Sequence, residues 1–217
     1  MTRNSSKVRT AEILREYGPF DGVTKVGGVT YDGHLVWAAT GAHLIGFDPE
    51  SGKQARSLEV AADAGTAFDG KFLYQIAAER INKIDPSSGT VVSSIPAPGK
   101  GADSGLAWAE GSLWVGQYRE RKIHQVNPET GAVLRTIESN RFVTGVTWVD
   151  GELWHGTWEG DRSDIRHVDP HSGDVLERLE MPPGVFVSGL ESDGSGVFFA
   201  GGENSGKVRA VRRPRGE

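Results

Sequence analysis

The sequence predicts an all-β fold, a five-bladed β-propeller that forms one domain over residues 1–217. Three observations predict it. A glycine, an aromatic residue three positions later and a second glycine recur along the chain. They recur about every 40 residues, the length of four short strands. The 30 glycines in 217 residues are about twice the usual share of roughly 7%, which is typical of many tight turns. The pattern begins at Gly28, Gly65, Gly105 and Gly145, and Gly189 holds the same place in a fifth unit.

Each unit is predicted to contain four short strands, named A to D in chain order. In the third unit they are the segments GLAWA, SLWVGQY, KIHQVNP and AVLRTIE. The A–B link carries a turn such as Asp32-Gly33, and glycine suits a hairpin turn because it accepts φ > 0. The C–D link reads DPESG, DPSSG, NPETG or DPHSG, in which proline presets φ and Asp or Asn caps the turn. These turns indicate antiparallel strands within each blade.

Large aromatic residues recur at fixed positions of strands A and B. Repetition of this kind indicates packing between neighbouring blades, because each blade needs the same space filled. We therefore assign no function to these nine residues. They are Tyr31, Phe68, Trp108 and Trp148 on strand A, and Trp37, Tyr74, Trp114, Trp154 and Phe198 on strand B.

The fifth unit lacks its strand D, since the chain ends soon after the segment KVRAVRR. The N-terminal residues Lys7–Tyr17 are strand-like and can supply the missing strand. We expect them to pair in antiparallel fashion with Lys207–Arg212, which closes the ring and protects its edge strands. Two alternatives remain open, a helix over Ala11–Tyr17 and an open β-solenoid.

Charge and composition narrow the range of functions. The net charge of −5 does not suggest a nucleic-acid partner, and we interpret the C-terminal basic cluster as a solvated tail. Without cysteine, no disulfide or thiolate chemistry is expected. No apolar run approaches the roughly 18 residues that span a bilayer, so we expect a cytoplasmic protein without a membrane partner. No histidine pair has ligand spacing beside a carboxylate, and we expect neither a metal nor a cofactor. The basic cluster comprises Arg209, Arg212, Arg213 and Arg215.

A site for a small polar molecule is expected at the axis, on the face built from the D–A and B–C connections. The B–C loops of blades 3 and 4, Gln117–Lys122 and Thr157–Asp164, are the richest in aromatic and charged residues. Aromatic rings there offer apolar faces, and a guanidinium suits an anionic or carbonyl group. Three hydroxyl residues directly precede the repeated glycines and are expected to form a ring near the axis. The predicted ligand-binding residues are Tyr118, Trp158, Arg119, Arg121, Arg162, Ser104, Thr144, Ser188, Phe142 and Asp103.

Two stretches resemble a known superfamily, the glutamine cyclotransferases. TGVTWVDGELWHGTWEGDRSDIRHVDPHSGDVL is similar to their fourth blade, and AGTAFDGKFLYQIAAERINKIDPSSGTVV is similar to their second. The resemblance covers nearly the whole chain and implies the same five-bladed fold. Those enzymes, the plant and bacterial type of glutaminyl cyclase, convert an N-terminal glutamine to pyroglutamate with release of ammonia.

The resemblance also implies that this chain lacks most of the family's active-site residues. The family's catalytic glutamate corresponds to Ala64, which cannot take or give a proton. Other active-site positions hold smaller residues than in the family, which implies a wider axial pocket. They are Gly27, Ala78, Ser104, Thr144 and Gly202, and only the fourth-blade tryptophan is kept, as Trp158.

We therefore expect a small-molecule enzyme with a glutamine-cyclotransferase-like propeller and a polar axial pocket, but not a glutaminyl cyclase. The alternatives are a non-catalytic small-ligand-binding propeller and a protein-interaction propeller, because one propeller fold hosts many functions.

Overall fold

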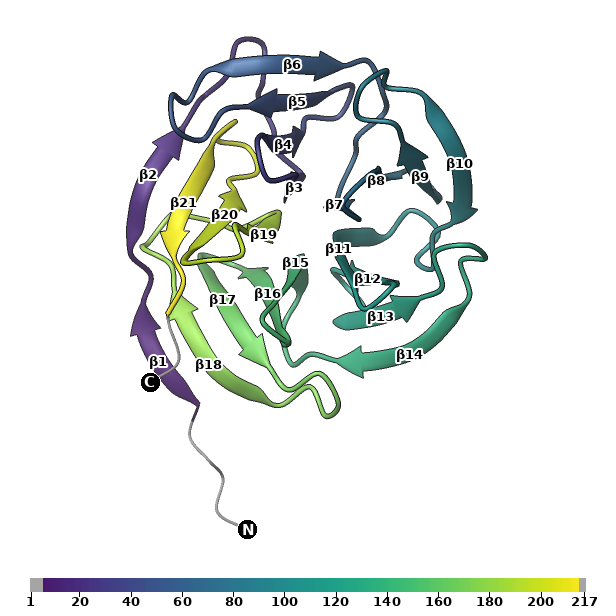
Figure 1. Ribbon diagram of the computed structural model, residues 1–217. Coiled ribbons are helices and arrows are strands. Elements are labelled where there is room, and N and C mark those ends of the chain that lie inside the picture. Colours follow the sequence, from purple (N-terminus) through teal and green to yellow (C-terminus); the bar gives the residue numbers. More distant parts are fainter. Residues whose placement is uncertain (1–5, 215–217) are drawn as a thin grey trace.

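The computed structural model describes residues 6–214, and every regular element in that range is a β-strand. Five sheets stand around a central axis, as Figure 1 shows, and in each of them strands A to D are neighbours that pair in antiparallel fashion. The fold is a five-bladed β-propeller, as the sequence predicts. Within the described range there is no helix long and apolar enough to cross a membrane.

In each blade strand A lies nearest the axis and strand D lies at the rim (Figure 1). Blade 1 contains β3 (Gly28–Tyr31), β4 (Val36–Ala39), β5 (Leu44–Phe47) and β6 (Gln54–Leu58). Blade 2 contains β7 (Thr66–Phe68), β8 (Leu73–Ala77), β9 (Arg80–Ile84) and β10 (Val91–Pro96). Blade 3 contains β11 (Asp103–Ala109), β12 (Ser112–Gln117), β13 (Lys122–Val126) and β14 (Val133–Glu138).

Blades 4 and 5 include the N-terminal strands. Blade 4 contains β15 (Val143–Val149), β16 (Glu152–Glu159), β17 (Arg162–Val168) and β18 (Val175–Glu180), with β1 (Lys7–Thr10) added outside β18. Blade 5 contains β19 (Leu190–Ser192), β20 (Val197–Gly201), β21 (Val208–Arg212) and β2 (Ile13–Tyr17).

Ring closure follows the predicted scheme. Strand β2 pairs with β21 in antiparallel fashion, with Glu16 opposite Arg209 and Tyr17 opposite Val208. The alternatives of a helix over Ala11–Tyr17 and of an open solenoid are both wrong. One feature was not predicted: β1 pairs in parallel with β18, so the N-terminal segment crosses from the rim of blade 4 to the rim of blade 5 (Figure 1).

The repeated glycines allow the inner strands to approach closely around the axis. A Cβ on Gly28 would lie 2.2 Å from the carbonyl oxygen of Ala64, in the next blade. A Cβ on Gly105 would lie 2.3 Å from the carbonyl oxygen of Thr144, and the other repeated glycines have comparable contacts. Any side chain at these positions would push neighbouring blades apart, which explains why the repeat begins with glycine.

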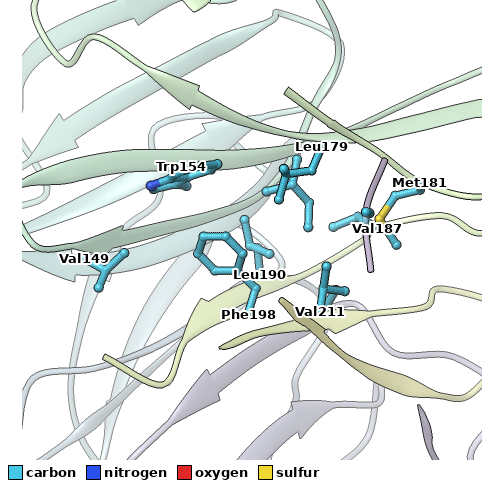
Figure 2. Packing of buried hydrophobic residues seen from close by; sticks show 11 residues of the cluster. Val149, Trp154, Leu179, Met181, Val187, Leu190, Phe198 and Val211 are labelled. Carbon is cyan, nitrogen blue, oxygen red and sulfur yellow. The ribbon is translucent and has the colours of Figure 1, made fainter. Parts of the chain in front are cut away.

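The repeated aromatic residues pack between blades, as predicted. Tyr74 of blade 2 stacks on Trp108 of blade 3, with ring centroids 5.4 Å apart, and the Trp114–Trp148 pair of blades 3 and 4 is 5.0 Å apart. Between blades 4 and 5, Trp154 lies against Phe198 at 5.0 Å, in the cluster shown in Figure 2. The strand B members of the set are almost fully buried, so they form core rather than site.

The C-terminal basic cluster is not a solvated tail, and that interpretation was wrong. Arg209 and Arg213 are each only 7% exposed. Arg209 pairs with Glu16 at 2.7 Å, and Arg213 pairs with Asp150 at 2.6 Å and Glu152 at 2.9 Å. Arg212 is exposed but pairs with Glu12 at 2.6 Å. The charges join the end of blade 5 to the N-terminal strand and to blade 4, and Arg215 lies outside the described residues.

Candidate functional site

A pocket of about 290 Å³ lies at the axis, next to the ring of repeated glycines. Residues from all five blades line it, mostly from the segment before each repeated glycine and from the B–C loops. Convergence from every blade is a consequence of the ring itself, because each D–A connection ends at the axis. The lining residues are Lys25, Gly27, Asp63, Ala64, Asp103, Ser104, Tyr118, Thr144, Trp158, Ser188 and Glu203.

Six of the ten predicted ligand-binding residues line this pocket. They are Asp103, Ser104, Tyr118, Thr144, Trp158 and Ser188. Phe142 lies behind Tyr118, with ring centroids 4.8 Å apart, and does not line the pocket.

The three predicted arginines lie elsewhere. Arg121 covers the ring of Phe142 at 4.6 Å and pairs with Glu159 at 2.8 Å. Arg119 is exposed, and Arg162 lines a separate cleft further from the axis. The predicted B–C loop Thr157–Asp164 is mostly strand, because β16 continues to Glu159 and β17 begins at Arg162. Neighbouring residues of this hairpin therefore face opposite sides.

The predicted ring of hydroxyls exists, but it serves the contacts between blades. Ser104 donates a hydrogen bond to the carbonyl oxygen of Val143, 2.8 Å away in the next blade. Ser188 donates to the carbonyl oxygen of Val26 in the same way. The hydroxyl of Thr144 is enclosed and has no hydrogen-bond partner among the described residues. These side chains shape the wall of the pocket, while their hydroxyls are largely turned into the structure.

Two aromatic side chains form a fixed wall on the blade 3 and blade 4 side. Trp158 stacks on Phe186 with centroids 4.7 Å apart, and its indole N–H donates to the carbonyl oxygen of Gly160 at 3.1 Å. The hydroxyl of Tyr118 donates to the carbonyl oxygen of Trp158 at 2.8 Å. Their orientation is set before any ligand arrives, as a flat apolar binding surface requires.

Four charged side chains line the pocket, and three of them were not predicted. The Lys25 Nζ and Glu203 Oε1 atoms are 3.4 Å apart, and Asp63 accepts a hydrogen bond from the backbone N–H of Ala78 at 2.7 Å. Lys25 and Asp63 stand just before the glycines of blades 1 and 2. Ser104 was selected because it directly precedes a repeated glycine. The same criterion in blades 1 and 2 points to Gly27 and Ala64, which lie next to Lys25 and Asp63 in the chain.

Glu203 is marked by an unusual backbone conformation, which is visible only in the structure. It has φ of 46°, a left-handed conformation that side-chain-bearing residues rarely adopt. Ala78 and Arg121 adopt the same conformation in the B–C connections of blades 2 and 3, with φ of 50° and 55°. Backbone of this kind persists where the surrounding structure holds it, and here it lies beside the pocket.

Asp103 is the buried acid of the pocket. It is 8% exposed and accepts hydrogen bonds from the backbone N–H of Gly99 at 2.9 Å and from the amide of Gln117 at 3.3 Å. Burial raises the pKa of the Asp103 carboxyl above its usual value, against these two donors. No cation pairs with it among residues 6–214. A buried, unpaired carboxyl group facing a cavity is suited to proton transfer.

Histidine contributes nothing to this pocket. His155 is fully buried within β16, and burial lowers its pKa to about 4, so the ring is neutral at pH 7 and belongs to the core. In the described part of the chain no group of three or more His, Cys, Asp or Glu residues is arranged so that it could hold a metal ion.

The fold and the axial pocket define the class, a five-bladed β-propeller with a site at the centre of one face. A family model described as glutamine cyclotransferase matches residues 135–201. The structure is similar to a Myxococcus xanthus glutaminyl cyclase, with a TM-score of 0.77 and 18% identity, over 96% of this chain and 98% of that one. These two findings confirm the resemblance to the glutamine cyclotransferase superfamily that the sequence indicates.

Other solved structures are less similar. A hydrazine synthase of Kuenenia stuttgartiensis gives a TM-score of 0.52 and 17% identity over 82% of this chain and 56% of that one. The WD40 propeller domain of Doa1 gives a TM-score of 0.56 and 16% identity, over 88% of this chain and 64% of that one. These likenesses concern the fold alone, and no curated protein matches the sequence significantly.

Five of the seven positions carried over from the superfamily meet at this pocket, whereas Ala78 and Gly202 do not line it. Gly27, Ala64, Ser104, Thr144 and Trp158 all line it. The position that the resemblance assigns to the family's catalytic glutamate is among them, and it holds an alanine, Ala64.

Proposed function

We propose that this protein is a small-molecule enzyme that uses the axial pocket, with chemistry different from that of a glutaminyl cyclase. One observation carries the proposal: Lys25, Asp63, Asp103 and Glu203 converge on one cavity of about 290 Å³ beside a fixed aromatic wall. Titratable groups gathered in a concave site are typical of catalytic sites.

The charges of the pocket favour a ligand with a cationic or hydrogen-bond-donating group. Three carboxyl groups and one lysine line it, and no arginine does. We therefore do not assign Arg119, Arg121 or Arg162 to a ligand of the axial pocket. Tyr118 and Trp158 supply the surface for an apolar or planar part of the same molecule.

Asp103 is the residue we propose for proton transfer. Burial raises the pKa of the Asp103 carboxyl, so the group holds a proton more readily than an exposed aspartic acid does, which suits a residue that exchanges a proton with a ligand. Gly99 and Gln117 hold its orientation, which leaves the group positioned toward the cavity without a competing cation. Lys25 and Glu203 would bind and orient the ligand at the opposite side.

Glutaminyl cyclase activity is not expected. Cyclisation needs a group that takes a proton from the attacking amine and helps ammonia leave, and Ala64 cannot do so. A pyroglutamate assay on Gln-initiated peptides should show no formation above the uncatalysed rate. Formation proportional to enzyme concentration would contradict this and would indicate that Asp63 or Asp103 has taken the role.

A thermal-shift screen of metabolites, followed by turnover assays on each hit, tests the proposal. Trp158→Ala and Thr144→Val should weaken binding of a hit, whereas His171→Ala, in a C–D turn on the opposite face, should not. If only His171→Ala changes binding, the site is wrong. If Asp103→Asn binds the hit normally and the wild type does not turn it over, the protein is a non-catalytic binding propeller.

Three further expectations belong to the same proposal. The partner is a small polar molecule, neither nucleic acid nor membrane is bound, and the protein acts in the cytoplasm. Cell fractionation of a tagged protein and a nucleic-acid gel-shift assay would test the last two directly.

A further inference from the structure

A second and larger cavity lies outside the axial pocket. It measures about 540 Å³ and reaches the outer strands, since residues of β18 and the end of β1 line it. The β16–β17 hairpin separates the two cavities. Trp158 faces the axial pocket and its neighbour Thr157 faces this outer cleft, because successive residues of a strand point to opposite sides.

Three arginines surround the outer cleft, namely Arg141, Arg162 and Arg178. Arg141 is held in place by Glu159, which also binds Arg121. The side chain of Arg162 is exposed and makes no hydrogen bond or ion pair with any residue that the structure describes.

Arg178 is also incompletely paired. Its guanidinium is 3.8 Å from Glu180, a weak contact, and its enclosed Nε has no hydrogen-bond partner within residues 6–214. The side chain as a whole is 30% exposed, so its remaining N–H groups can reach an oxygen ligand in the cleft, and an enclosed donor such as Nε is stabilised by an acceptor.

The carboxylates of the cleft neutralise these two arginines only in part, because Glu180 makes just the 3.8 Å contact with Arg178. Asp164 is committed to Arg166, which it meets at 2.7 and 3.0 Å, and to the hydroxyl of Thr157 at 2.6 Å. Asp161 and Glu180 are both exposed, at the mouth of the cleft. Asp164 therefore bonds to Arg166 and Thr157 within the cleft, while the guanidinium groups of Arg162 and Arg178 have N–H donors that no residue of the cleft accepts.

The remaining wall is rigid. Met181 donates its backbone N–H to the carbonyl oxygen of Ser163 at 3.0 Å, and Pro182 and Pro183 follow directly. Proline restricts the backbone, so this wall does not need to be ordered when a ligand enters.

We propose that the outer cleft is a second binding site, for a small molecule that carries a carboxylate or phosphate group. Arg162 and Arg178 would hold that group, and Arg141 lies at its edge. A planar guanidinium offers paired N–H donors that match two oxygens of such a group, and charge-assisted bonds of this kind are among the stronger ones. The site is distinct from the axial pocket and goes beyond the function proposed for it.

Isothermal titration with inorganic phosphate and, separately, with succinate tests the site at constant ionic strength. We expect saturable binding of at least one of them with a Kd of about 1 mM or below. Arg178→Gln and Arg162→Gln should each weaken it by about tenfold, the equivalent of one lost charge-assisted contact. Binding of phosphate alone would identify a phosphate-bearing ligand, and binding of succinate alone a carboxylate-bearing one.

Arg119→Gln is the matched control, because Arg119 is an exposed arginine that lines neither cavity. It should leave the Kd unchanged, as should Trp158→Ala, which alters only the axial pocket. The thermal midpoint of each variant without ligand checks that it is folded. Absence of saturable binding of both anions, or an equal loss in Arg119→Gln, would overturn the proposal, and neither result would affect the axial site.

Discussion

The outer strands of blades 1 to 4 and the outer strand of blade 5 are held in different ways. In blades 1 to 4 strand D follows strand C through a tight turn, in which Gly52, Gly89, Gly131 and Gly173 take positive φ of 75–78°. In blade 5 the outer strand is β2, which comes from the other end of the chain and has no such turn. It is held by ion pairs to β21, Glu16 with Lys207 and Arg209, and Glu12 with Arg212.

The difference shows what sets strand register. A tight turn fixes register covalently, because its length and conformation leave one pairing. A strand that arrives from the other end of the chain needs other signals, since a slip of one residue would move every side chain to the wrong face. Opposite charges placed across from each other supply that signal at the closing blade.

Removal of residues 1–17 should have the largest effect. It deletes β1 and β2, exposes the edges of β18 and β21, and leaves Arg209 buried without Glu16. We expect a loss of more than about 5 kcal/mol in unfolding free energy, or failure to fold, because buried charges and edge strands both lose partners. Urea unfolding followed by circular dichroism measures it. A deletion variant with the wild-type midpoint would show that the ring does not depend on this closure.

Glu191 should make stability depend on pH at the closing blade. It accepts hydrogen bonds from Thr30 of blade 1 at 2.8 Å and Thr147 of blade 4 at 2.5 Å, and burial raises its pKa to about 7. The carboxyl group of an unfolded chain loses its proton near pH 4.5. Between that pH and about 7, therefore, the unfolded state binds fewer protons than the folded state, and stability falls as pH rises.

Glu191→Gln removes this titration, so the stability lost by the wild type between pH 4.5 and 8 should be about 2 kcal/mol larger than that lost by the variant. Unfolding free energies across this range measure it. Glu79→Gln, at an exposed position, is the control and should keep the wild-type profile. Superimposable profiles for Glu191→Gln and wild type would exclude Glu191 as the source.

Charge reversal at Glu16 tests the register argument directly. Glu16→Lys faces Lys207 and Arg209, so we expect a loss of about 2 kcal/mol, since Arg209 is buried and would lose its partner. Adding Arg209→Glu should recover part of the loss, which a double-mutant cycle measures. Equal and additive losses in both variants would show that the pair does not specify the closure.

Gly89→Ala should have the smallest effect of the four. Its φ is 75°, but a Cβ there would meet only ordinary contacts of about 3.5 Å with Leu58. Only backbone strain remains, and we expect a loss of about 1 kcal/mol in thermal or urea unfolding. A loss equal to that of the N-terminal deletion would contradict the view that each turn secures only its own strand.

Much of the fold was predictable because the same pattern of turn and core residues occurs in each blade. Turn glycines such as Gly52 and Gly89, and inter-blade aromatics such as Trp114, act through short-range sterics and burial that are visible in sequence. The parallel pairing of β1 with β18 was not predictable, because no turn connects the two strands and parallel partners are distant in the chain.

The site was predictable only where it depends on the repeated pattern. The place of Ser104, Thr144 and Ser188 follows from their spacing to the repeated glycines, so the sequence determined the position of the axial pocket. The tertiary structure alone decided which way the side chains of Arg119, Arg121 and Arg162 point. Arg162 faces the outer cleft because the β16–β17 hairpin is longer than its sequence indicated, and residues of a strand alternate between its two sides.

The sequence alone thus determined the blade count, the turns, the inter-blade aromatics and the closure by the N-terminal strand, since each depends on residues close in the chain or repeated along it. Only the tertiary structure decided which charges meet. Asp103 is buried without a cation, Lys25 lies beside Glu203, and Arg213 reaches Asp150 of another blade. Such pairings depend on distances between segments far apart in the chain, and the charge of a single residue does not reveal its partner.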